Sequence, residues 1–305
     1  MRVGGLLLIA ATTGSLLVSA ALGAPAPPTG AIVFASAPGS AIAAPSEIAY
    51  TSVVGGPVVD LTHAGRRGMV AAEPRWSPDG SRIVFVMAPR RYLNAYAGDG
   101  NIYVMSANGT DLHKLTRGLD ASAPAWSPDG SRIVFIEGQG QALVVMHADG
   151  SHRHVVAQAR GYYESPAWSP DGRLIAYESG SDWHSKAIFT IRANGSGERR
   201  LTRRSDSIGD PAWSPDGSRI AYSSGNRIWI MTASGASARP VTTCRPASCV
   251  FDFAPGWSPS GRELVFVRQE DGGAARHLYV LKLATHRLRP LAPAVRWAGS
   301  PDWRP

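Results

Sequence analysis

The sequence predicts an all-β fold, a six-bladed β-propeller of four-stranded antiparallel blades. A string close to "PAWSPDGSRIVF" recurs along the chain, and each copy is followed by further short apolar segments that end in tight turns. Glycine (33 residues) and proline (23 residues) are abundant, which is typical of many short strands joined by turns. A unit of four short strands cannot bury both of its faces alone, so the repeats are expected to pack radially.

The N-terminus has the pattern of an export signal. A positive start, Met1-Arg2, precedes an apolar run over residues 4–22. Cleavage after Gly23 places small residues, Ala21 and Gly23, at the two positions that such cleavage prefers. The alternative is a retained membrane anchor, because the run is about as long as a bilayer-spanning helix.

These observations divide the chain into three parts. We expect a signal peptide over residues 1–23, a short linker over residues 24–29 and the propeller over residues 30–305. The protein is then exported to the periplasm or cell envelope, or secreted, and keeps no integral membrane segment after signal cleavage.

Tryptophan sets the register of the repeat. Six copies lie 42 to 50 residues apart: Trp76, Trp126, Trp168, Trp213, Trp257 and Trp303. The first five open a "WSPxG" string, whose variable place holds Asp79, Asp129, Asp171, Asp216 and finally Ser260. In such a string serine accepts backbone hydrogen bonds, proline fixes φ, and glycine adopts the positive φ that ends a turn. We therefore interpret these residues as structural hairpin turns rather than as a catalytic motif.

The strands that follow each turn allow the blades to be counted. An apolar strand such as "RIVFV" from Arg82 leads to a second one such as "NIYVMSA" from Asn101, and then to an "NG", "DG" or "SG" turn. Five units are complete, and the N-terminal part supplies three more strands, beginning at Gly30, without a tryptophan. The C-terminal "SPDWRP" from Ser300 supplies the missing first strand. The ring should therefore be closed by the C-terminal strand, which pairs into the N-terminal blade.

The repeated pattern resembles that of the TolB-like propeller family, "PAWSPDG…IAF…IYVM…ADG…LT". The resemblance runs in register over nearly all of the mature chain and implies a six-bladed propeller of this family. TolB itself carries an α/β domain before its propeller, and the short stretch between the signal and the first strand predicts that this chain lacks it. Related propellers precede the hydrolase domain of prolyl oligopeptidase-type enzymes, but the chain contains no G-x-S-x-G nucleophile elbow.

Binding residues are expected at the end of the ring opposite the "WSPxG" turns, where the connections differ between blades. These connections are rich in arginine and aromatic residues, the composition of binding hot spots. The candidates are Arg90, Arg91, Tyr92, Tyr96, Tyr162, Tyr163, Trp183, Arg203, Arg204, Phe251, Phe253 and Trp297. The alternative is a set of solvated loops with a few aromatic side chains packed between blades.

Two acidic residues are predicted at the mouth of the central channel. Glu73 and Asp210 lie three residues before a repeat tryptophan in blades two and five, which face each other in a six-fold ring. Two facing carboxylates could hold a cation, although separate surface acids are the favoured interpretation. We expect no metal and no cofactor.

Cys244 and Cys249 flank the turn sequence "RPAS" and are expected to form a disulfide in an oxidising compartment. The alternative is a pair of free thiols in a loop.

The balance of features favours an exported, monomeric, non-enzymatic scaffold that binds a protein or peptide. The net charge of +8 comes almost wholly from arginine, which favours an acidic protein or an anionic envelope polymer over nucleic acid. A lactonase-like or lyase-like propeller enzyme and a carbohydrate-binding module are the alternatives. Alanine or serine fills four of the six positions equivalent to Glu73, which favours the scaffold over an enzyme.

Overall fold

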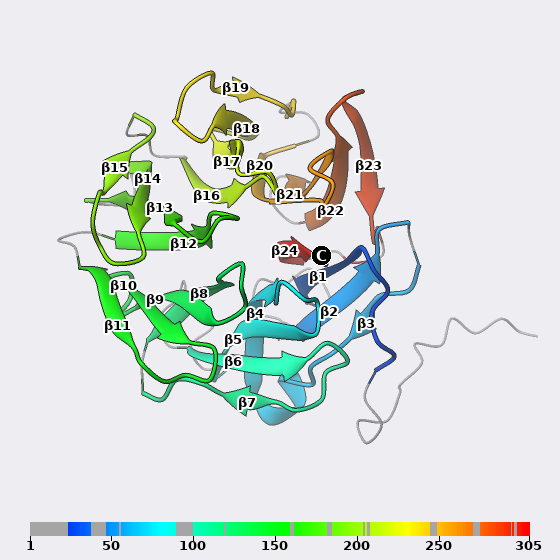
Figure 1. Ribbon diagram of the computed structural model, residues 1–305. Helices are drawn as coiled ribbons and strands as arrows, with labels where there is room; N and C mark the ends of the chain where they lie inside the picture. The colour runs from blue at the N-terminus through cyan, green and yellow to red at the C-terminus, as the bar shows by residue number, and fades with distance from the viewer. Residues whose placement is uncertain are drawn as a thin grey trace, which may run out of the picture.

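Six four-stranded antiparallel sheets form a ring in the computed structural model (Figure 1). The structure describes residues 24–37, 47–54, 56–89, 100–118, 120–158, 162–181, 185–203, 205, 208–244, 249–270, 275–293, 295 and 298–305. The predicted six-bladed β-propeller is therefore confirmed. Within these ranges no helix is long and apolar enough to cross a membrane.

Each blade runs from an inner strand at the channel to an outer strand at the periphery (Figure 1). The inner strands are β4 (Met69–Trp76), β8 (Ala121–Trp126), β12 (Tyr162–Trp168), β16 (Ile208–Trp213), β20 (Phe251–Trp257) and β24 (Ala298–Trp303). The second strands are β1 (Ala31–Ser36), β5 (Arg82–Pro89), β9 (Arg132–Glu137), β13 (Leu174–Gly180), β17 (Arg219–Ser224) and β21 (Glu263–Glu270).

The outer half of each blade consists of its third and fourth strands. The third strands are β2 (Glu47–Ser52), β6 (Asn101–Ser106), β10 (Ala142–His147), β14 (Lys186–Arg192), β18 (Arg227–Thr232) and β22 (Ala275–Lys282). The outer strands are β3 (Val59–Asp60), β7 (His113–Lys114), β11 (His154–Gln158), β15 (Arg199–Arg200), β19 (Arg239–Pro240) and β23 (Arg287–Leu291), and a single 3-10 turn, η1 (Gly65–Arg67), follows β3. We number the blades in chain order, so that blade 1 contains β24, β1, β2 and β3.

The two chain ends close the ring in blade 1. Strand β24 pairs antiparallel with β1, with Trp303 opposite Ile32 and Ala298 opposite Ser36. The next residue, Arg304, donates through Nε and Nη2 to the carbonyl oxygen of Gly80 at 3.2 and 3.0 Å. The pairing that the lone C-terminal strand predicts is thus confirmed, and Arg304 extends it into blade 2.

The "WSPxG" turns satisfy their own polar groups. In the first of them, Ser77 Oγ donates to Asp79 Oδ1 at 2.5 Å and accepts from the backbone N of Arg82 at 2.9 Å. The hydrogen bond from Ser77, followed by those from Ser81, lowers the pKa of Asp79 to about 2. The carboxylate is therefore a structural acceptor that fixes the hairpin.

Arginine side chains join neighbouring blades. The arginine after each "WSPDGS" string lies over the tryptophan of the next blade, as with Arg82 over Trp126 at 4.7 Å and Arg219 over Trp257 at 4.8 Å. Such cation–π contacts contribute about 0.5–2 kcal/mol each. At the closure Arg304 plays this part and lies 5.4 Å from the centre of the Trp76 ring.

The glycine of the second hairpin allows adjacent blades to approach closely. Gly109 has φ +84°, and a Cβ there would lie 2.7 Å from the carbonyl oxygen of Leu61 in the preceding blade. Gly235 repeats this arrangement with φ +84° and a Cβ position 2.7 Å from the carbonyl oxygen of Leu201. Larger residues at these positions would push the blades apart.

Deletion of Ser300–Pro305 tests the closure. It removes most of the inner strand of blade 1, including the Trp303 side chain, which is 7% exposed. Loss of a buried tryptophan alone costs about 3–5 kcal/mol, so we expect Tm to fall by roughly 10 °C. Deletion of Pro305 alone is the control. A truncated protein with the Tm of the parent in a thermal scan would contradict the proposed closure.

Candidate functional site

The variable face is the end of the ring opposite the "WSPxG" turns, where chain segments enter each inner strand. Phe251 opens β20 there and is 44% exposed. Arg203 is also exposed, while Phe253 is half-buried with the guanidinium of Arg276 5.3 Å from its ring. These residues give the described part of the face an exposed aromatic side chain and cationic side chains.

The two predicted tyrosines at the start of β12 differ in their surroundings. Tyr162 is half-buried and lies against Gly140. Tyr163 is 4% exposed, packs edge-on against Tyr177 at 5.4 Å, and has its pKa raised to about 12 by burial. Tyr163 therefore contributes mainly to packing between strands and offers a partner little surface.

Seven other candidates fall outside the residues that the structure describes: Arg90, Arg91, Tyr92, Tyr96, Trp183, Arg204 and Trp297.

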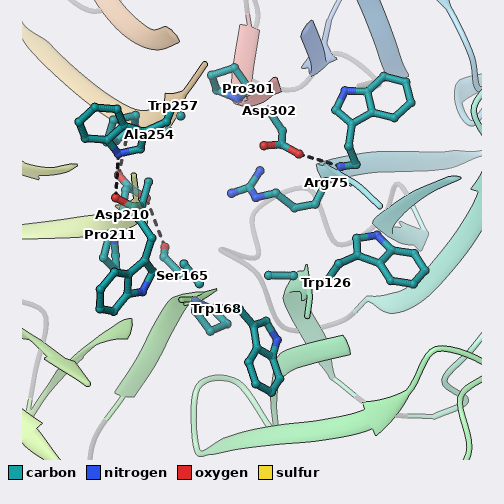
Figure 2. Close-up of a pocket in the computed structure, with 18 of the residues that line it drawn as sticks. Arg75, Trp126, Ser165, Trp168, Asp210, Pro211, Ala254, Trp257, Pro301 and Asp302 are labelled. Carbon is teal, nitrogen blue, oxygen red and sulfur yellow. Dashed lines mark hydrogen bonds between the residues drawn. The ribbon is translucent and has the colours of Figure 1, made fainter. Parts of the chain in front are cut away.

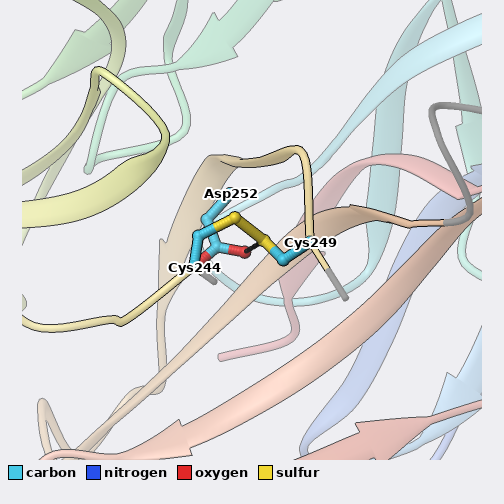
Figure 3. Close-up of side chains that lie close together, drawn as sticks. All are labelled: Cys244, Cys249 and Asp252. Atoms are coloured by element: carbon cyan, nitrogen blue, oxygen red, sulfur yellow. Dashed lines mark hydrogen bonds between the residues drawn. A yellow bond between two sulfur atoms is a disulfide. The ribbon is translucent and has the colours of Figure 1, made fainter. Parts of the chain in front are cut away.

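A disulfide holds the loop that leads to Phe251 (Figure 3). Cys244 and Cys249 are bonded, with their Cα atoms 5.2 Å apart, and both are buried. Asp252 lies beside them, with Oδ1 3.5 Å from the sulfur of Cys249. These three residues are close enough to resemble a metal site, but both sulfur atoms are already committed to the disulfide.

A buried ion pair between Arg268 and Asp252 holds the chain on both sides of the disulfide. Arg268 donates through Nε and Nη2 to the two carboxylate oxygens of Asp252 at 2.7 and 2.9 Å. Its Nη2 also donates to the carbonyl oxygen of Thr243, the neighbour of Cys244, at 3.3 Å. Loss of either partner in such a pair leaves a buried charge uncompensated, which typically costs 3–5 kcal/mol. The backbone next to the exposed Phe251 is therefore held in place by the disulfide and the ion pair.

The channel carboxylates fasten neighbouring blades together. Glu73 Oε2 accepts the backbone N–H of Ala123 at 2.6 Å, and Asp210 Oδ2 accepts that of Ala254 at 3.1 Å. Asp210 also accepts from the hydroxyl of Ser165 at 3.2 Å.

All six residues at this level of the inner strands have a positive φ and lie at a break in the strand register: Glu73, Ala123, Ser165, Asp210, Ala254 and Ser300. The break turns an amide N–H out of the strand ladder in each blade. In two blade junctions a carboxylate of the preceding blade accepts it.

The channel contains a cavity with a volume of about 270 Å³. Its walls are the tryptophans and prolines of the inner strands, with three prolines of the "WSPxG" turns, and Figure 2 shows Arg75 and Asp302 on one side with Asp210 and Ser165 on another. Asp302 Oδ2 accepts the backbone N–H of Trp76 at 2.7 Å, so it is a third carboxylate that joins two blades. The role of Asp302 was not predicted, because the other repeats carry Arg75, an alanine or a glycine at that position.

A second group of charged side chains, also missed, lies in blade 4. Lys186 Nζ is 2.6 Å from Glu164 and 4.0 Å from Glu178, whose side chain is 6% exposed. A Cβ on Gly209 of the next blade would lie 2.4 Å from Glu178 Oε2, so the carboxylate fills the junction. The sequence does contain a signal for Glu178: it is an acidic residue at a strand position where the other blades have Val86 or another apolar or small residue.

Burial raises the pKa of two of the acidic residues near the channel, Glu178 and Glu73. The pKa of Glu178 is raised well above its ordinary value, first by burial and then by the charges of Glu164 and Asp210. The pKa of Glu73 is also raised by burial, and Glu164 and Asp210 add to the shift.

The substitution Glu178→Gln tests whether the buried carboxyl group of Glu178 destabilises the protein when it is ionised. When a carboxyl group has a higher pKa in the folded than in the unfolded state, the protein becomes less stable as pH rises above the ordinary pKa of that group. We therefore expect Glu178→Gln to raise Tm at pH 8 and to reduce the fall in Tm between pH 5 and pH 8.

Asp79→Asn is the matched control, because its pKa of about 2 gives the opposite dependence. This variant should be destabilised at neutral pH and approach the parent as pH falls towards 2. A Glu178→Gln variant less stable than the parent at pH 8 would show that the carboxylate is favourable there.

Comparisons with known proteins agree with the geometry. The family model described as "TolB beta propeller domain" matches residues 122–249. TolB from Acinetobacter baumannii superimposes with a TM-score of 0.72 and 19% identity, covering 90% of this chain and 67% of that chain. No curated protein sequence matches.

Two further solved structures share the fold. A chain of the nidogen/laminin complex has a TM-score of 0.68 and 14% identity, covering 90% of this chain and 98% of its own. Oligogalacturonate lyase in complex with manganese has a TM-score of 0.53 and 17% identity, covering 86% of this chain and 73% of that chain. At these identities the structures are informative about fold alone. Together with the repeat and the six closed blades, these comparisons show a six-bladed β-propeller that is similar to the TolB propeller domain over residues 122–249.

Proposed function

We propose that this chain is an exported, monomeric, non-enzymatic scaffold that binds a protein or peptide on its variable face. The observation that carries this proposal is Phe251, a large apolar side chain that is 44% exposed above a buried disulfide and ion pair. Rigid aromatic anchors flanked by arginine are typical of binding hot spots.

The opposite face supports the same assignment, because its polar groups are already used within the ring. The turn carboxylates accept from their own serine residues, as in Ser127 Oγ to Asp129 Oδ1 at 2.5 Å. In the channel, Glu73 and Asp210 accept from the next blade and Glu164 pairs with Lys186. The groups of an enzyme site would instead be directed at a substrate.

One of the similar folds belongs to a protein–protein complex by its description, the nidogen/laminin complex. Export is supported by the N-terminal signal pattern and by the disulfide, since disulfides persist in oxidising compartments. An acidic partner is favoured by the net charge of +8.

The substitutions Phe251→Ser and Arg203→Glu test the proposal in affinity capture from an envelope extract of the native organism. Truncation of a hot-spot aromatic costs at least about 2 kcal/mol, so we expect a 30-fold or greater loss of affinity for the captured species. Val155→Ser is the matched control, because Val155 is 46% exposed on the outer strand β11.

The identity of the captured species decides between the candidate functions. A protein or peptide that is lost with Phe251→Ser and retained with Val155→Ser supports the scaffold. A polysaccharide, a chemically altered small molecule, or equal capture by all variants would contradict it.

A further inference from the structure

The outer strands of five blades carry basic side chains and no acidic ones. In blades 2 to 6 these are β7, β11, β15, β19 and β23, which lie at the periphery of the ring (Figure 1). The exposed lysine and arginine residues on or directly before them are Lys114, Arg153, Arg199, Arg200, Arg239 and Arg287, which we call the basic rim. One exposed acidic residue, Glu198, directly precedes β15. Blade 1 differs, because its outer strand carries Asp60.

Basic side chains of the outer strands also reach across the junctions between blades. Arg199 Nη2 donates to the carbonyl oxygen of Ser234 in the next blade at 3.0 Å. Arg289 Nη2, further along β23 than Arg287, donates to the carbonyl oxygen of Val53 in blade 1 at 2.6 Å. At these two junctions, between blades 4 and 5 and between blades 6 and 1, an arginine therefore links neighbouring blades.

Most of this charge has no acidic partner. Among the described residues, Arg153 pairs with Glu137, and the other five members of the rim form no ion pair. The partner of Arg199 is a neutral carbonyl group. The guanidinium groups of Arg200, Arg239 and Arg287 are thus exposed and available to an external anion.

Protection of sheet edges explains the positive charge but not the choice of arginine. Charged residues on an edge strand, lysine in particular, prevent pairing with another sheet. Five of the six rim residues are nevertheless arginine. Arginine in particular binds carboxylate and phosphate groups through two parallel hydrogen bonds.

We propose that the basic rim binds a linear anionic polymer of the cell envelope, bearing carboxylate or phosphodiester groups. A linear chain can follow the periphery and contact several blades at once, so that many weak contacts add up. This site lies on a different surface from the variable face and goes beyond the protein-binding function proposed above. It would leave the variable face open to a partner while the polymer is bound.

The test compares two double substitutions that remove the same charge. Arg199→Gln with Arg200→Gln alters the rim, and Arg66→Gln with Arg67→Gln alters the exposed turn η1 as a control. Binding of alginate, of polyglycerol phosphate and of a 20-base-pair DNA duplex is measured at two salt concentrations. Tm confirms that each variant is folded.

We expect the rim variant to bind alginate or polyglycerol phosphate about 25-fold more weakly, since each arginine near an anionic surface contributes about a fivefold factor. Its affinity should also depend less on salt, while the η1 variant stays within about twofold of the parent. The two polymers show whether carboxylate or phosphodiester is preferred. Equal losses in both variants, tighter binding of DNA than of either polymer, or no binding by the parent would overturn the proposal.

Discussion

The pairing of β24 with β1 is the interaction on which the rest of the structure depends. A radial array of sheets has two exposed edges until its first and last blades are joined, and here one blade is made from both chain ends. Arg304 strengthens this junction by bonding to Gly80 and stacking over Trp76. Inner-strand carboxylates also join neighbouring blades, as Asp302 of β24 does with Trp76. Loss of the pairing between β24 and β1 would therefore weaken contacts in the channel as well as at the chain ends.

Closure of the ring also determines which residues have structural roles and which are left for binding. Turns that repeat in every blade use their polar groups internally, as Ser77 and Asp79 do, and this leaves little for an external partner. Phe251, on its disulfide-linked loop, and the exposed arginines of the outer strands lie outside these turns. They are therefore the features that we expect an external partner to contact.

The fold was largely predictable from the sequence, and the sites were predictable only in part. The spacing of Trp76 and its repeats fixed the blade number, and the isolated Trp303 indicated closure, because both features follow from local patterns. The ion pairs of Asp252 with Arg268 and of Glu164 with Lys186 were missed, since each joins residues 16 or more positions apart in the chain. The burial of Tyr163 was missed for a related reason: its environment is set by Tyr177 on the adjacent strand and not by its neighbours in sequence.

The central claim is that repeated residues build the ring and that the surface which varies between blades binds the protein partner. Amide hydrogen exchange of the protein with and without its captured partner tests this most directly, because protection reports which backbone segments the partner covers. The account predicts new protection around Phe251 and the other segments of the variable face, with the turns at Asp79, Asp129, Asp171 and Asp216 unchanged. Protection concentrated in those turns would contradict it.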